Sequence, residues 1–195
     1  MYQIVKAPNP VLSAVAKKIT KIDASIKKLV TEMTETLENA KDPEGVGLAA
    51  PQVGKSLQLF LAKETEKSPV IVFINPQITS FTDNQKKSAK GRSASPKGAM
   101  PGGKPTDVKL EGCLSLTDVW GVVKRHDRVT LSYTDFTTGQ MQIKMFKGFL
   151  ATIIQHEVDH LHGILFPKRV LEQKGTLYKS KKNEKGETVF EEIKL

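Results

Sequence analysis

Two histidines and a glutamate in the second half of the chain form a compact motif that could bind a metal ion. Residues 156–160 have the sequence HEVDH, which fits the pattern HExxH. Within a helix, His156 and His160 would project from one face, one turn apart, where both imidazoles can reach a single ion. Glu157 would stand beside that ion without binding it, where a general base is needed. The motif therefore predicts a hydrolytic metal site; the alternative is a chance pair of core histidines.

The third ligand distinguishes among the hydrolases that share this motif. One class of zinc peptidases has a third histidine in the pattern HExxHxxGxxH, but this chain has Phe166 at that position. A second class needs a downstream glutamate, and those of this chain lie in a polar tail that offers little to hold a ligand rigidly. Cys113, the only cysteine, is the better candidate, although a lone cysteine is also commonly a small buried thiol. One cysteine and two histidines leave a fourth tetrahedral position for water, which is typical of catalytic sites.

Helices are expected in two places. Apolar residues recur at helical spacing over residues 147–162, which would carry both histidines, and Gly163 is a natural end. A second helix is expected from Asp23, which can cap it, to about residue 41. The two elements account for the strongest helical periodicity in the chain.

Runs of β-forming residues predict the strands that would surround the metal-binding helix. They cover residues 57–62, 70–74, 119–123, 128–133 and 140–146. Asn75 and Pro76 are expected to end the second of these strands, and the last two should form a hairpin around a turn at residues 135–139. The predicted fold class is α+β, with the HExxH helix packed among mostly antiparallel strands.

The composition is that of one globular domain. The chain has 195 residues, of which 38% are hydrophobic and 26% are charged, so it can bury a core without disulfide bonds. A single cysteine excludes an intramolecular disulfide, and no apolar stretch approaches the roughly 18 residues of a membrane span. We therefore expect a cytoplasmic protein that does not associate with membranes.

The formal charge of +9 is unevenly distributed. Residues 83–109 contain seven basic and two acidic residues among glycines, prolines and serines, with almost no large apolar side chain. This stretch, here called the basic insertion, is expected to be flexible and to be either a solvated loop or a contact with RNA or another acidic surface. Residues 1–167 would then form the catalytic domain around it, and residues 168–195 a polar C-terminal extension.

Three segments in this order resemble those of peptide deformylase. They are GVGLAAPQ at residues 45–52, EGCLS at residues 111–115 and QHEVDH at residues 155–160. The resemblance implies an enzyme that removes the formyl group from N-formylmethionyl peptides, namely nascent chains on the ribosome, and releases formate. It also implies that Cys113, His156 and His160 hold one divalent metal, typically Fe²⁺, with Zn²⁺, Ni²⁺ or Co²⁺ as replacements in a purified form.

The same resemblance assigns roles around the metal. Glu157 would be the general acid and base, and the Gln52 side chain with the Leu114 backbone N–H would stabilise the oxyanion. Gly47 would hold the substrate through its backbone. Because glycine has no Cβ, another chain can approach that backbone closely.

Helical spacing adds a candidate pocket for the methionine side chain. Phe149, Thr152 and Ile153 lie seven, four and three residues before His156, hence on the face that carries the metal ligands. Together with Val46 they could line an apolar slot, although the same residues could simply be core. An ion pair between Arg125 and Asp159 is a further hypothesis.

Two other functions remain open from the residues alone. A metallopeptidase would use the same motif to cleave a peptide bond. An RNA-binding or ribosome-binding module with a structural metal would use the basic insertion, through which ribosomal RNA could be contacted.

Overall fold

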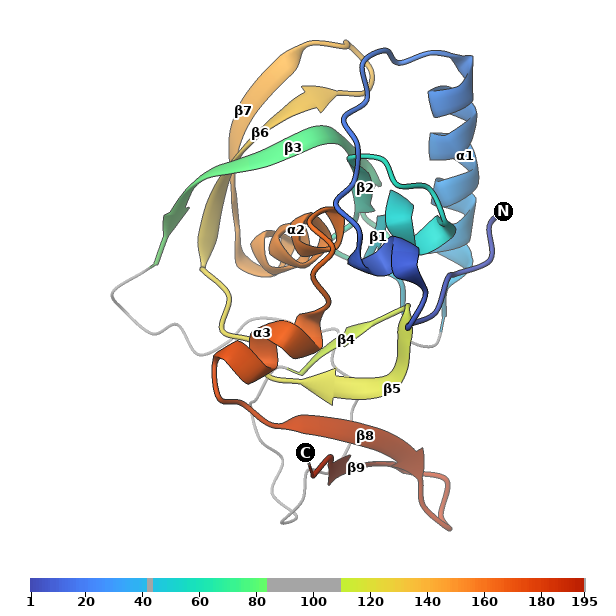
Figure 1. The fold of residues 1–195 in the computed structure, drawn as a ribbon, viewed down its shortest axis with the longest axis vertical. Helices are drawn as coiled ribbons and strands as arrows, with labels where there is room; N and C mark the ends of the chain where they lie inside the picture. Colours follow the sequence, from blue (N-terminus) through green and yellow to red (C-terminus); the bar gives the residue numbers. More distant parts are fainter. Residues whose placement is uncertain (42–43, 84–109, 195) are drawn as a thin grey trace.

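The computed structural model describes residues 1–41, 44–83 and 110–194 (Figure 1). The basic insertion expected at residues 83–109 lies outside the described residues except for Asp83. No helix in the described ranges is long and apolar enough to cross a membrane.

The larger of two sheets has five antiparallel strands in the order β1-β2-β3-β6-β7. Their bounds are Gly47–Ala49 for β1, Leu59–Ala62 for β2, Ile71–Thr82 for β3, Arg128–Asp135 for β6 and Met141–Lys147 for β7. The expected hairpin of β6 and β7 is confirmed, because residues 128–134 pair with residues 141–147 in continuous register.

The prediction that Asn75 and Pro76 end a strand is wrong, since β3 continues to Thr82. The register of β3 against β6 shifts between Ile74 and Gln77, so Pro76 sits in an irregularity where it need not donate to the ladder. Asn75 has a positive φ of 49° there. Its side chain also binds both the N–H and the carbonyl of Ile19.

The helix α2, Gly148–Leu161, packs against one face of this sheet and begins directly after β7. Its buried Ala151, Ile154 and Val158 share an apolar cluster with the inward-facing residues of the strands. Phe73 and Phe60 stack at the centre of that cluster with ring centroids 4.6 Å apart. In Figure 1, α2 lies between the curved β3 and the second sheet below it. The predicted α+β fold, with the HExxH helix among antiparallel strands, is confirmed.

The helix α1, Ala24–Asn39, buries its apolar side in a second cluster that includes Leu48, Leu59 and Leu61 of the same sheet. Its start agrees with the sequence, because the Asp23 carboxylate accepts from the backbone N–H groups of Ser25 and Ile26. Two short 3₁₀ helices flank the region: η1, Pro10–Ser13, and η2, Ala50–Val53.

The second sheet is also antiparallel and has the order β4-β5-β8-β9. The strands are Glu111–Cys113, Leu116–Gly121, Leu177–Lys182 and Thr188–Glu192, and α3, Phe166–Glu172, precedes β8. Within the segment expected to be a polar C-terminal extension, residues 168–194 contribute most of α3 and both strands β8 and β9. Its buried apolar residues are few: Val170 and Leu177 pack with Cys113 and Phe166, and Phe190 packs with Leu110 and Trp120.

Candidate metal centre

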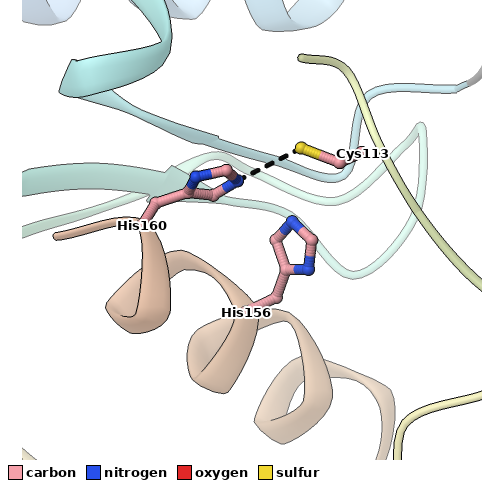
Figure 2. Close-up of side chains that lie close together, drawn as sticks. All are labelled: Cys113, His156 and His160. Carbon is pink, nitrogen blue, oxygen red and sulfur yellow. Dashed lines mark hydrogen bonds between the residues drawn. The ribbon is translucent and has the colours of Figure 1, made fainter. Parts of the chain in front are cut away.

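The side chains of the three expected metal ligands lie close together (Figure 2). His156 and His160 lie one turn apart on α2, with ring centroids 4.9 Å apart, and Cys113 ends β4. One ligand atom from each residue lies within 4.8 Å of those of the other two, and all three residues are buried. Cys113 Sγ lies 3.2 Å from His160 Nε2.

These residues fit a divalent metal ion. A thiolate and two imidazoles suit zinc, iron, nickel and cobalt, and three protein ligands leave one position open for water or substrate. Glu157 Oε2 is buried beside them and has no hydrogen-bond partner among the described residues. A buried carboxylate oxygen left unpaired in this way is expensive unless a ligand or water uses it.

Glu111 orients His156 from the second sheet. Its Oε1 lies 2.7 Å from His156 Nδ1, so Nε2 is the nitrogen left for a metal. Sequence reasoning included Glu111 in the EGCLS motif but gave it no role. Glu111 and Cys113 are two residues apart in β4, which is not among the strands expected from the sequence, so alternation along that strand could not indicate the role of Glu111.

A line of ion pairs continues from Glu111. Arg125 binds Glu111 through Nε and Nη2, at 3.1 and 2.7 Å, and Asp159 through Nη1, at 2.6 Å. The hypothesised pair of Arg125 and Asp159 is thereby confirmed. Arg169, which sequence reasoning missed, also binds Asp159.

The environment separates the acid–base properties of the two histidines and the glutamate of the HExxH motif on α2. Burial raises the pKa of the Glu157 carboxyl to about 7. Burial would lower the pKa of His156, but the Glu111 carboxylate outweighs it and holds that pKa well above the usual value. Burial and the neighbouring His156 together lower the pKa of His160. A histidine must lose its proton to bind a metal, so metal binding at His156 should release a proton.

Gln52 approaches the centre from η2 and is almost fully buried. Its Oε1 accepts from the Ala49 N–H at 2.8 Å, which fixes the orientation of the amide. Nε2 therefore points to Cys113 Sγ, at 3.4 Å, and to Ser115 Oγ, at 3.3 Å. Leu114, whose backbone N–H is the other predicted oxyanion donor, lies between Cys113 and Ser115 in sequence.

Gly47 lies directly against Glu157 from the other side. A Cβ placed on Gly47 would come within 2.2 Å of Glu157 Oε1 and 2.9 Å of Ile153 Cγ2. Only glycine can therefore occupy this position of β1 without displacing the carboxylate. β1 is an edge strand and pairs only with β2 among the described residues.

The candidate pocket residues are only partly brought together. Ile153 is buried in the main apolar cluster, and Val46 and Phe149 pack against that cluster while remaining partly exposed. Thr152 is half-buried on the same helix. The other two histidines contact different residues: His126 pairs with Asp83, and His162 Nδ1 lies 2.8 Å from the Val158 carbonyl.

The sequence and fold match known proteins over most of their length. The family model for polypeptide deformylase matches residues 1–175. The chain belongs to the peptide deformylase family. A peptide deformylase of Desulforudis audaxviator is 35% identical over 182 residues, covering 93% of this chain and 98% of the relative. One from Dictyoglomus turgidum is 39% identical over 171 residues, covering 88% and 94%.

The fold comparison agrees. The crystal structure of peptide deformylase from Thermotoga maritima superposes with a TM-score of 0.68 at 32% identity, covering 87% of this chain and 97% of that one. The chain is therefore a hydrolase that removes the formyl group from N-formylmethionyl peptides during N-terminal maturation, in a metal-dependent reaction. The family match extends to residue 175 and thus includes α3.

Proposed function

We propose that Cys113, His156 and His160 hold the catalytic metal and that this metal is Fe²⁺ in the cell. The convergence of these three donors beside the unpaired Glu157 carboxylate is the observation that carries the proposal. A divalent ion at such a site supplies a Lewis acid and lowers the pKa of water towards 7. Because availability commonly selects among ions that suit one donor set, Zn²⁺, Ni²⁺ or Co²⁺ would replace iron in some preparations.

Glu157 is the general base and then the general acid of this mechanism. Its free Oε2 accepts the proton of the attacking water and later delivers it to the departing amine. The raised pKa suits both roles, since at about 7 the carboxyl exchanges protons readily near neutral pH. The contact with Gly47 keeps the other oxygen in place.

Gln52 and Leu114 stabilise the negative charge that develops on the formyl oxygen. Gln52 Nε2 is already oriented towards the centre by the bond from the Ala49 N–H to Oε1. A preorganised donor costs no reorientation when the charge appears, and loss of one such donor costs about 3 kcal/mol. The Leu114 backbone N–H, next to Cys113, is the second donor.

The substrate lies as an extended peptide along β1, where Gly47 offers its backbone at the free edge of the sheet. Its methionine side chain enters the slot formed by Val46, Phe149, Thr152 and Ile153. Support comes from the packing of three of these residues against one apolar cluster directly beside the metal-binding face of α2.

The cellular setting belongs to the same proposal. The enzyme acts in the cytoplasm on nascent chains at the ribosome, where Cys113, which forms no disulfide, is protected from oxidation. The basic residues of the stretch 83–109 supply the charge for a contact with ribosomal RNA.

Formate release from formyl-Met-Ala-Ser, compared with the acetylated and free peptides, tests the site. We expect turnover of the formylated peptide alone, abolished by a chelator and independent of added RNA. Cleavage of a backbone peptide bond would instead support a metallopeptidase. Metal analysis of protein purified without oxygen should find iron, and the Cys113→Ser variant should lose tight metal binding. A variant that retained it would contradict the ligand assignment.

A further inference from the structure

The short helix α3 reaches the metal centre by two routes. The Phe166 ring lies nearly parallel to that of His156, with centroids 6.3 Å apart and an interplanar angle of 26°. One turn later, Arg169 binds Asp159 of α2 through two nitrogens, Nε to Oδ2 at 3.1 Å and Nη2 to Oδ1 at 2.7 Å. A forked pair of this kind fixes both the distance and the orientation of the two groups.

Arg169 is the outer cation of an alternating series of charges. From α3 inward the order is Arg169, Asp159, Arg125, Glu111 and His156, and each successive pair is within hydrogen-bonding distance. The side chains of Arg125, Asp159 and Glu111 are 8%, 9% and 11% exposed, against 31% for Arg169. The series therefore runs from the solvent to a metal ligand through buried ion pairs.

The two guanidinium groups balance the two buried carboxylates. With Arg169 in place, Asp159 has a cation of its own, and Arg125 can direct its Nε and Nη2 to Glu111. Without Arg169, Arg125 would be the one arginine left, among the described residues, to pair with both Asp159 and Glu111. Asp159 would then draw the Arg125 guanidinium away from Glu111. Buried charges left short of a partner are strongly unfavourable, so the pairs would rearrange.

The same helix also rests on the sheet that carries Cys113 and Glu111. Val170 is fully buried and packs closely on Gly121, because a Cβ placed on Gly121 would come within 2.7 Å of Val170 Cγ2. Gly121 of β5 is the register partner of Glu111 in β4. Phe166 and Val170 also share an apolar cluster with Cys113 of β4, so α3 contacts both elements that would supply metal ligands, and Arg169 is its polar link to α2.

We propose that Arg169 is a positioning residue for the metal site, acting through Asp159, Arg125 and Glu111 on the orientation of His156. The inference rests on the proposed metal binding by His156 and assigns no contact between Arg169 and the substrate. Outer partners of metal ligands typically change affinity by 10- to 100-fold, so a residue one step further away should have a smaller effect.

Metal release from the cobalt-loaded enzyme into excess chelator tests this directly. We expect Arg169→Gln to release cobalt about 10-fold faster than the unaltered enzyme, and Arg169→Lys to fall between them because it keeps the charge but loses the fork. Glu172→Gln is the matched control, since Glu172 pairs with Arg169 from the exposed side of the same helix, at 3.0 Å. Its release rate should stay within about 2-fold.

Two further measurements separate positioning from general stability. Thermal unfolding of the metal-free variants reports a merely structural role, which would lower the melting temperature without changing cobalt release; that result overturns the proposal. In an Asp159→Asn background, Arg169→Gln should add no further acceleration, and an undiminished effect there would overturn the proposed route. If Arg169→Gln fails to fold, Arg169→Lys is expected to release cobalt about 3-fold faster, and an unchanged rate would overturn the inference.

Failure of the proposed metal site is distinguishable from failure of this inference. Unaltered enzyme that held cobalt no more tightly than Cys113→Ser would show that the ligand set is wrong. Tight cobalt binding with equal release from Arg169→Gln would show only that Arg169 has no positioning role.

Discussion

His156 and Glu157 are neighbours on α2, yet each is positioned by a different half of the molecule. His156 is held from the four-stranded sheet, where Glu111 Oε1 lies 2.7 Å from its Nδ1. Glu157 faces the five-stranded sheet and lies against the Gly47 backbone, where no side chain would fit. The His156 imidazole thus has a chain of charged partners, whereas one oxygen of the Glu157 carboxyl has no hydrogen-bond partner in the part of the chain that the structure describes.

The two halves are built differently in a way that matches these tasks. The five-stranded sheet and its helices bury two large apolar clusters, while the four-stranded sheet has two small ones and joins α2 through ion pairs. Apolar packing is non-directional and excludes water, which raises the pKa of Glu157. Forked ion pairs are directional and fix the orientation of an imidazole. Reactivity and ligand geometry are therefore supported by different kinds of interaction.

The largest expected effect separates the two neighbours most sharply. Glu157→Ala should lower turnover of formyl-Met-Ala-Ser by at least about 100-fold, because the proton acceptor is lost while all three metal donors remain. Metal content per chain, measured on the same preparation, should be unchanged. A variant without metal would mean that Glu157 is itself a ligand and that both neighbours serve the ion.

Glu111→Gln should produce the opposite pattern. The amide keeps the shape of the side chain but removes the charge between His156 and Arg125, so metal affinity should fall by about 10- to 100-fold. With saturating metal, turnover should recover to within about 10-fold of the unaltered enzyme, since Glu157 and Gln52 are untouched. Competition with a chelator of known affinity measures the first effect. Equal metal affinity in both proteins would show that the charged half does not support the ligand.

Much of the five-stranded half could be predicted from the sequence. Its helices follow the 3.6-residue period, Asp23 marks a start, and the HExxH spacing alone places His156 and His160 on one face. The path of β3 beyond Pro76 could not, because its continuation depends on a register shift against β6 and on the bonds from Asn75 to Ile19. Such contacts join residues more than 50 positions apart, where no local pattern reports them.

The four-stranded half was harder to predict for a related reason. Cys113 could be chosen as a ligand because of its chemistry, but the series from Glu111 to Arg169 connects four segments by charge alone. Charged residues are common in the sequence, and their composition resembles that of a solvated surface. Residues 168–195 look polar for the same reason, although Val170 and Leu177 anchor them to β5.

The smallest expected effect concerns substrate recognition on the five-stranded side. Thr152→Trp should fill the proposed methionine slot and raise KM for formyl-Met-Ala-Ser by about 5- to 10-fold, with kcat much less affected. Thr152→Ser, which adds no volume, is the matched control and should leave KM nearly unchanged. A formylated peptide with a small first side chain should recover part of the loss, because it leaves room for the indole.

Cobalt release from Thr152→Trp should not change, since Thr152 belongs to none of the ion pairs that hold His156. An equal loss on both peptides would place Thr152 outside the slot, and faster cobalt release would show that the two halves are not independent.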